Sequence, residues 1–428
     1  MSFSRIALIL STAVCALFAQ SYQNLTLQNC IEIAKKSSLS VASTRLTEKT
    51  AASALTQAKN ARLPGLNGSA DQDVVNGRPF AEPSSFDYLT ALSMRLSSSM
   101  PIYRGDIAHS INRAEYNKEI AKLRSEAAER VLSEQVIKAY MQVWSLTESE
   151  TAARASLALS KRMLARDSVL FNAGSYTASD LALSFAQAAS DSLNLLQAQS
   201  NLTRYFTELR QLLEIPYGTA FSLSPPDSVN AEKMAEYKTL LLQAQENSIN
   251  KKVDSLSILV ADESIGIAKA DRLPKINLSG GLSAGLYWKE PEYGTQLKTG
   301  FRYTATLGLS VPIIDWGATE HRILVEQVAK EDRQIASIST QKQLENAIEQ
   351  LVLQVETYRV QWEVSSLQLE AGKLSLEKSV QQHELGMLDI SSLVQQQTIF
   401  NNSQIKHNQA KYSYLLSKSL LDLQTGNF

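Results

Sequence analysis

Two long stretches without proline constrain the fold of this 428-residue chain more than any other feature of its sequence. The residues between Gly105 and Phe171 contain neither proline nor glycine, and those between Gly317 and Glu384 contain no proline and one glycine, Gly372. A stretch of roughly 67 residues is about 100 Å long if it is helical. A helix of that length has no globular core to lie on, so both must pack on other long helices. Apolar residues at alternating steps of three and four indicate the seams of a coiled coil.

A β-hairpin is expected before each long helix, over residues 65–100 and 275–311. In the last strand, apolar residues alternate strictly with polar or small ones from Phe301 to Val311. Strict alternation over about ten residues, with aromatic side chains at strand ends, is typical of a tilted strand that crosses a bilayer. Two hairpins packed as a small soluble sandwich would alternate in the same way, and this alternative stays open. The polar face, which we expect to line a water-filled lumen, carries Arg95, Arg302, Thr304 and Thr306.

The order of these elements occurs twice in the chain. The tripeptide RLP at residues 62–64 returns at 272–274, and SMPIYRG at 99–105 corresponds to SVPIIDWG at 310–317 with one inserted residue. An internal repeat has to be recognised before any fold is proposed. Each half is expected to contain a first helix, a hairpin, a long helix, a glycine break and a second helix.

Prolines and glycines give the expected boundaries of the repeats. The first repeat is expected over residues 20–214 and the second over 235–428, with a linker at 215–234. The helices are expected, in chain order, at residues 25–61, 105–171, 179–214, 235–270, 317–384 and 389–424.

Residues 1–19 have the pattern of a secretory signal peptide, in which Arg5 precedes an apolar run and Ala19 precedes a polar stretch. After this segment no apolar run approaches the roughly 20 residues of a transmembrane helix, so any membrane crossing must be made by strands. The formal net charge of −1 does not suggest a nucleic-acid partner. We therefore expect an exported protein.

The chain contains two cysteines, Cys15 and Cys30. Cleavage of the signal peptide removes Cys15 and leaves Cys30 alone, which excludes an internal disulfide. A lipidated N-terminus at Cys15 is the alternative, although Val14 is bulkier than the small residue that such processing prefers.

Four strands per chain are too few to close a barrel, because about eight is the smallest number whose interior accommodates side chains. In lipid, open strand edges would leave backbone groups without hydrogen bonds. Several chains must therefore pool their hairpins. The sequence predicts a mixed α and β membrane protein. Each chain is expected to contribute two β-hairpins to an oligomeric transmembrane β-barrel, and long antiparallel coiled-coil helices to a periplasmic α-barrel.

Several motifs occur in matching order in the two halves. They are the opening LTLQNCIEIAKKSS, the LP elements before the hairpins, SMPIYRG and SVPIIDWG after them, and FNAGSYTASDL and HELGMLDISSL at the helix breaks. In this order the chain resembles the outer membrane efflux protein family, the TolC-like channels. The resemblance implies a homotrimer in the outer membrane of a Gram-negative cell, with a large periplasmic part. It implies outer membrane lipid, a periplasmic adaptor protein and an inner-membrane pump as partners.

The expected function is that of a passive exit channel, from periplasm to exterior, in a tripartite efflux pump or a type I secretion system. Drugs, metal ions and unfolded proteins all remain open as cargo. A periplasmic coiled-coil adaptor or structural spacer is the alternative, and a surface-exposed fibre is a second one. The sequence contains no nucleophile elbow, P-loop or dinucleotide fingerprint, so we expect neither an enzyme nor a cofactor. His109 and His321 lack further ligands at metal-binding spacing and are expected on the helix surface.

The resemblance also implies a gate at the periplasmic helix tips, where family members often carry acidic residues after the second glycine break. Here Ser392 and Gln395 occupy those positions, and the nearest carboxylate is Asp389. Asp180, after the first break, does match the family pattern. The hypothesis is that Asp389 from three subunits forms or flanks a ring that favours cations. The alternative is that Asp389 is the N-cap of the last helix.

The family's basic and tyrosine tethers are replaced at these tips by Leu388 and His383. Small and apolar residues beside a glycine allow close backbone approach, and the tips are therefore our candidates for adaptor contact. The alternative is that they are only the turns that every helical hairpin needs. The candidates are Gly174, Ser175, Tyr176, Gly386, Met387 and Leu388.

Overall fold

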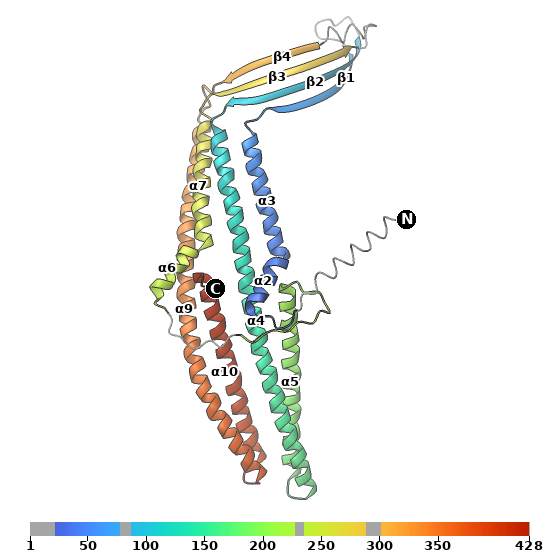
Figure 1. The fold of residues 1–428 in the computed structure, drawn as a ribbon, viewed down its shortest axis with the longest axis vertical. Helices are drawn as coiled ribbons and strands as arrows, with labels where there is room; N and C mark the ends of the chain where they lie inside the picture. The colour runs from blue at the N-terminus through green and yellow to red at the C-terminus, as the bar shows by residue number, and fades with distance from the viewer. Residues whose placement is uncertain (1–21, 78–86, 227–234, 288–300, 428) are drawn as a thin grey trace. The chain divides into compact units, whose positions relative to one another are not determined.

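The computed structural model describes residues 22–77, 87–226, 235–287 and 301–427, mostly as helices with one small antiparallel sheet (Figure 1). The first half contains α2 (Leu27–Ser37), α3 (Leu39–Asn60), β1 (Gly65–Gly77), β2 (Asp87–Tyr103), α4 (Asp106–Asn172) and α5 (Ala178–Leu212). The second half contains α6 (Tyr237–Asn247), α7 (Ile249–Ala270), β3 (Lys275–Tyr287), β4 (Phe301–Ser310), α9 (Ala318–Glu384) and α10 (Ile390–Thr425). The identical order confirms the two-fold repeat. The expected signal peptide with Cys15, both hairpin turns and part of the linker lie outside the described residues.

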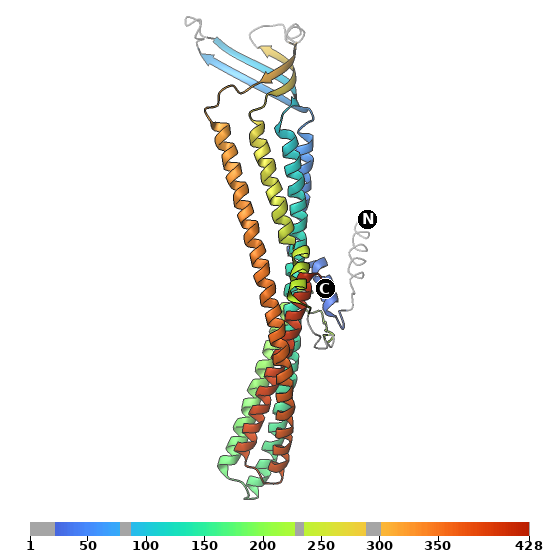
Figure 2. The ribbon, with the colours of Figure 1, turned by 90° about the vertical axis from the view of Figure 1, so that its left-hand side faces the viewer.

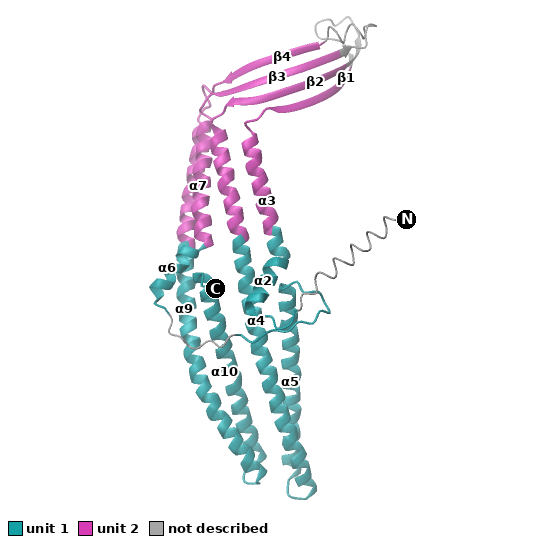
Figure 3. Ribbon diagram, in the orientation of Figure 1, with its two compact units in different colours: residues 1–43, 126–248, 341–428 teal, residues 44–125, 249–340 magenta. Residues whose placement is uncertain are grey.

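The chain forms two compact units, and each contains segments of both repeats (Figure 3). The described parts of residues 1–43, 126–248 and 341–428 form unit 1, and residues 44–125 and 249–340 form unit 2. The long helices α4 and α9 begin in unit 2 and continue in unit 1. Equivalent segments of the two repeats are thus packed together. Among the described helices, none is at once long and apolar enough to cross a membrane.

The sheet of unit 2 has the strand order β1-β2-β3-β4, and all neighbouring strands are antiparallel. The pairing of β2 with β3 joins the two hairpins. Both faces of β4 are exposed in the single chain. Within the described residues, β1 and β4 are paired on one side only, so the sheet ends in two open edges.

The first hairpin is longer than the sequence predicts. It is expected to end at residue 100, but β2 continues to Tyr103 because Pro101 stays in the ladder opposite Asn277 of β3. A register shift between Pro101 and Tyr103 accommodates the missing proline N–H. In the second hairpin β4 ends at Ser310, one residue before the expected end at residue 311.

Each opening helix is broken where the sequence predicts one continuous helix. Ser38 separates α2 from α3, and Ser248 separates α6 from α7; their extended ψ angles are 124° and 111°. Serine competes with helical hydrogen bonds through its own side chain and therefore favours such interruptions. The two breaks occupy equivalent positions, so they are a property of the repeated unit.

The hydrophobic core of unit 1 gathers side chains from α2, α4, α5, α9 and α10. Tyr140 is fully buried there, and Trp362 stacks on Tyr414 with ring centroids 5.5 Å apart. Cys30 is also fully buried, and this burial raises the pKa of its thiol to about 12. The thiol therefore stays protonated and unreactive at neutral pH. Cysteines introduced at exposed positions can be labelled without interference from it.

A close helix contact in unit 2 gives a prediction about stability. His109 of α4 lies 2.6 Å (Nδ1 to Oε2) from Glu263 of α7, and a Cβ atom at Gly266 would come 2.5 Å from the same ring nitrogen. Gly266→Ala should therefore lower the thermal unfolding midpoint, even though alanine favours a helix by about 1 kcal/mol over glycine. The expected cause is displacement of the His109 ring from Glu263.

The matched control is Gly372→Ala in α9. A Cβ atom there would lie 3.7 Å from the Ser403 hydroxyl, an ordinary contact, so this variant should keep or raise the unfolding midpoint. Adding His109→Ala to Gly266→Ala should recover part of the lost stability. Equal midpoints for the two single glycine variants would contradict the packing described for Gly266.

Candidate gate at the helix tips

Each long helix of unit 1 ends in a glycine with left-handed backbone angles. The φ angle is 76° at Gly174 and 75° at Gly386. In both tips the N–H of the next residue donates to the carbonyl oxygen five residues earlier, at 2.9 and 2.8 Å. Residues with a Cβ atom rarely adopt these angles, so the glycine breaks seen in the sequence are required by the turn itself.

The helices after the two breaks begin with polar caps. The Thr177 hydroxyl accepts the backbone N–H of Asp180 at 3.1 Å and donates to the Asp180 carboxylate at 2.6 Å. Asp389 is the N-cap of α10 and accepts the backbone N–H of Ser392 at 2.8 Å. Asp180 and Asp389 therefore both stabilise the start of a helix.

Asp389 is exposed and stays ionised in all but strong acid. Its carboxylate accepts the Ser391 hydroxyl, the backbone N–H of Ser392 and the Ser392 hydroxyl, and these hydrogen bonds lower its pKa from 3.8 to about 2. The cap stabilises the tip above pH 3.8, and this contribution is lost as the pH falls toward 2. The structure thus brings together two of the gate candidates, Asp389 and Ser392. Gln395 is exposed on the next turn.

A buried polar cluster joins the two helical hairpins at their tips, which lie at the same end of unit 1 in both views (Figures 1 and 2). His383 of α9 is 1% exposed and Asp167 of α4 is 0% exposed, and Nε2 of the histidine lies 3.4 Å from the carboxylate. Arg166 donates to the carbonyl oxygen of His383 at 2.7 Å and to that of Glu384 at 3.1 Å. These contacts hold the α4–α5 tip against the α9–α10 tip.

The contacts of His383 determine which nitrogen carries its proton. Nδ1 lies 2.8 Å from the carbonyl oxygen of Leu388, which can only accept, so Nδ1 is the donor. Nε2 lies 3.4 Å from the Tyr176 hydroxyl and 3.4 Å from the Asp167 carboxylate. A neutral ring can accept from Tyr176, whereas a protonated ring must donate, and Asp167 is then its acceptor.

The carboxylate of Asp167 has two hydrogen-bonding partners besides His383. One carboxylate oxygen accepts the Ser184 hydroxyl of α5 at 2.6 Å, and the other lies 3.2 Å from Arg166. Burial first, and then the charge of Asp167, raise the pKa of Tyr176, so its hydroxyl stays protonated and able to donate. A fully buried carboxylate needs such partners, because an unpaired one costs several kcal/mol.

Sequence reasoning missed the roles of Asp167 and Arg166 and treated His383 only as the occupant of a tether position. The spacing of apolar residues in the two helices nevertheless pointed to this pair. His383 follows Val380 and Leu376 at steps of three and four, and Asp167 follows Met163 at a step of four. Titratable residues at seam positions of two different helices are candidates for a buried pair.

The adaptor-contact candidates differ in their surroundings. Leu388 packs against a small hydrophobic cluster with Met163, Ile390 and Leu393. Met387 is exposed, as are Gly174, Ser175 and Gly386, and Tyr176 is half-buried beside His383. Each tip thus presents exposed residues around its glycine and uses one side chain to hold the hairpins together.

The lumen candidates share one face of the sheet in unit 2. Arg95 of β2 opposes Ser283 of β3, and Ser283 opposes Arg302 of β4. Thr304 and Thr306 are on the same face, because they lie two and four residues beyond Arg302. The opposite face is mostly apolar, with Gln72 and Ser98 as polar members.

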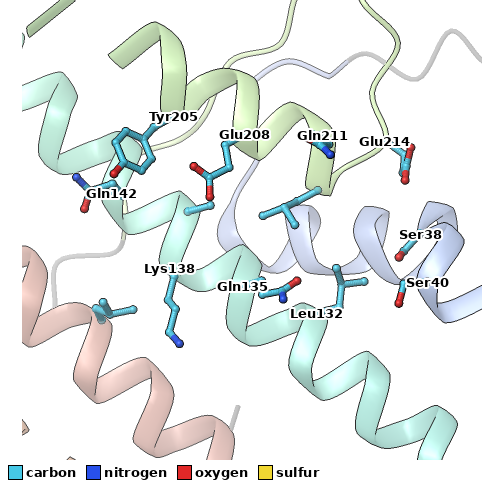
Figure 4. Close-up of a pocket in the computed structure, with 13 residues that line it drawn as sticks. Ser38, Ser40, Leu132, Gln135, Lys138, Gln142, Tyr205, Glu208, Gln211 and Glu214 are labelled. Atoms are coloured by element: carbon cyan, nitrogen blue, oxygen red, sulfur yellow. The ribbon is translucent and has the colours of Figure 1, made fainter. Parts of the chain in front are cut away.

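A groove in unit 1 of about 650 Å³ lies beside α4 and α5 (Figure 4). Six of its thirteen lining residues are charged or carry an amide, namely Gln135, Lys138, Gln142, Glu208, Gln211 and Glu214. Small-molecule sites are usually enclosed and mostly apolar, with few polar groups. The lining is instead typical of a hydrated surface between helices.

The two repeats match the family model described as Outer membrane efflux protein, over residues 30–214 and 240–427. Outer membrane protein TolC of Vibrio cholerae is 23% identical over 305 residues, which are 71% of this chain and 67% of that protein.

Solved outer membrane channels have the same fold. The CmeC channel of Campylobacter jejuni is 18% identical, with a TM-score of 0.79 over 94% of this chain and 85% of that one. VceC of V. cholerae is 17% identical, with a TM-score of 0.75 over 94% of this chain and 96% of that one. The family match covers both repeats, including both tips and all four strands, and the chain therefore belongs to the outer membrane efflux protein family.

Proposed function

We propose that three copies of this chain form the outer membrane exit channel of a tripartite efflux system, a passive conduit from the periplasm to the exterior. The observation that carries the proposal is a four-stranded sheet with one polar face, one apolar face and two open edges, in a member of a family of outer membrane efflux proteins. A periplasmic adaptor or spacer has no need of such a sheet.

The open edges require partners if the sheet lies in lipid. Each unpaired backbone group there costs several kcal/mol. Strands alternate in direction across the sheet, so β4 of one copy can pair antiparallel with β1 of the next. Three four-stranded sheets joined in this way make a closed barrel of twelve strands, enough for a water-filled interior. Arg95 and Arg302 then face the lumen.

The part of α9 that belongs to unit 1 has an apolar face that no other helix of the same chain covers. Leu353, Val360, Leu367 and Leu374 follow one another at seven-residue spacing and are all exposed in the single chain. A seven-residue apolar repeat is the seam of a coiled coil, and a second helix is needed to cover it. A neighbouring copy supplies that helix, and the helices of three copies then form a periplasmic α-barrel below the membrane.

The helix tips of unit 1 are the proposed gate and adaptor-contact region. Asp389 is ionised at any periplasmic pH, and three such carboxylates around an axis attract cations. Asp180, Ser392 and Gln395 are the other residues of the proposed gate. The exposed residues around Gly174 and Gly386 supply the surface for a periplasmic adaptor, which links the channel to an inner-membrane pump.

Asp389→Asn tests the ring in the purified protein, inserted into a planar lipid bilayer. Asparagine is also an effective N-cap, so the variant should keep the helix start and lose only the charge. Cation selectivity of the single-channel current should fall. Asp389→Ala, which removes both cap and charge, is the comparison. Unchanged selectivity in Asp389→Asn would reject the ring, and wild-type protein that passes no ions would reject the channel.

Site-specific photo-crosslinking tests the adaptor contact. A photoreactive residue at Met387 should capture a periplasmic adaptor in cells, because the side chain is exposed at the tip. Tyr217 is the control position, since it is 96% exposed but lies beyond the far end of α5, roughly 50 Å of helix away. Capture of the same adaptor from both positions, or from neither, counts against the tip as the contact.

A further inference from the structure

The loop between β4 and α9 exposes three large apolar side chains. Ile313 is 89% exposed, Ile314 is 70% exposed and Trp316 is 94% exposed. These residues belong to SVPIIDWG, which is one residue longer than the equivalent SMPIYRG of the first repeat. Burying apolar surface of this size is favourable by about 25 cal/mol per Å², so full hydration of these side chains is costly.

The loop is held in a defined shape by Asp315. Its carboxylate accepts the backbone N–H of Gly317 at 3.1 Å and that of Thr319 at 2.9 Å. Trp316 has a φ of 53°, one of three described non-glycine residues with a positive φ. Such angles are unfavourable for a bulky residue and persist only where surrounding contacts impose them. The exposure of Trp316 is therefore built into the turn.

The exposed side chains continue the apolar face of the sheet. Leu307, Leu309, Val311 and Ile313 alternate in sequence, and all four are exposed. Leu307 and Leu309 lie on the apolar face of β4, because alternate residues of a strand share one face. Val311 and Ile313 follow the end of the strand at Ser310, so exposed apolar side chains continue into the loop before α9 begins at Ala318.

Charged groups lie directly beside the loop. Arg272 pairs with Glu320, and Arg322 pairs with Asp271. Ile313 and Ile314 line a shallow pocket of about 290 Å³ together with Asp271, Arg272 and Glu320. An apolar surface bordered by arginine and carboxylate groups, with a tryptophan at the border, matches the headgroup region of a bilayer.

We propose that Ile313, Ile314 and Trp316 form a membrane anchor that inserts into the phospholipid headgroup and upper acyl region on the side of the outer membrane where the helices begin. The inference rests on the proposed function, because it takes the sheet to cross that membrane. The anchor fixes the depth of the barrel. Only its tryptophan is particular to the second repeat, because SMPIYRG carries exposed Ile102 and Tyr103 at the positions of Ile313 and Ile314.

Depth-resolved fluorescence quenching tests the anchor. Wild-type and Trp316→Phe proteins are reconstituted into phosphatidylethanolamine–phosphatidylglycerol vesicles whose acyl chains carry bromine near the headgroup or near the bilayer centre. The difference in emission between the two proteins reports Trp316. This Trp316 emission should be quenched when the bromine lies near the headgroup and largely kept when the bromine lies near the bilayer centre. Aqueous acrylamide should quench it only weakly.

Other outcomes overturn the anchor. Strong quenching by acrylamide places Trp316 in water, and protection from both acrylamide and brominated lipid places it against a neighbouring copy. Tyr303→Trp in the Trp316→Phe background separates the two proposals, because Tyr303 lies on the apolar face of β4. If that tryptophan is quenched by brominated lipid and Trp316 is not, the anchor fails while the channel stands. If neither is quenched, both proposals fail.

Discussion

Replacing both Val360 and Leu367 of α9 by glutamate should convert the assembled channel into separate folded chains. Both side chains are exposed in the single chain and belong to the seven-residue apolar repeat that a neighbouring copy is proposed to cover. Burying each of them contributes about 1.5–3 kcal/mol, and a carboxylate in its place adds a desolvation cost. The change acts at every interface of the ring. Native mass spectrometry in mild detergent should show one chain per particle.

Gln354→Glu is the matched control for this prediction. It adds one carboxylate, half the charge of the double variant, at another exposed position of α9 outside the seven-residue repeat. This variant should keep the assembly, and both proteins should keep the helix content of the wild type. Assembly that survives in the double glutamate variant would show that the exposed repeat is not an interface between copies.

His383→Ala is expected to open the channel. The substitution removes the contacts of the ring with the Leu388 carbonyl, the Tyr176 hydroxyl and the Asp167 carboxylate. It leaves the buried carboxylate of Asp167 with Ser184 and Arg166 alone. Leaving buried polar groups without a hydrogen-bonding partner costs about 1–3 kcal/mol, and about 1.4 kcal/mol corresponds to a tenfold change in an equilibrium. Single-channel recording should show a much larger open probability. Gln381→Ala, at an exposed position two residues earlier in α9, should leave it unchanged.

His383→Gln separates the loss of hydrogen bonds from the loss of the ring. Glutamine keeps a donor and an acceptor of similar reach. Its open probability should therefore lie closer to that of the wild type than that of His383→Ala. An unchanged open probability in His383→Ala would contradict the role of the cluster in holding the tips together.

The order of elements was predictable because it depends on local signals. Proline and glycine residues mark the ends of the strands and long helices. The alternation of apolar with polar or small residues from Phe301 to Val311 identifies β4. Departures arise where tertiary contacts override those signals. Pro101 stays in the sheet because β3 lies opposite it, and Ser38 and Ser248 break helices that the apolar pattern continues.

The candidate site was predictable only in part. The glycine turns and the N-cap at Asp389 follow from residues close in sequence, so local rules can find them. The pair of His383 and Asp167 joins residues more than 200 positions apart, and nothing in either helix alone indicates that they meet. The loop at Trp316 was likewise visible only as an inserted residue.

The central claim is that the sheet edges of one chain are closed by other copies of the same chain. Native mass spectrometry of the purified wild-type protein in mild detergent tests it most directly. Particles of three chains are the expected result, and a stable, folded single chain would contradict the account.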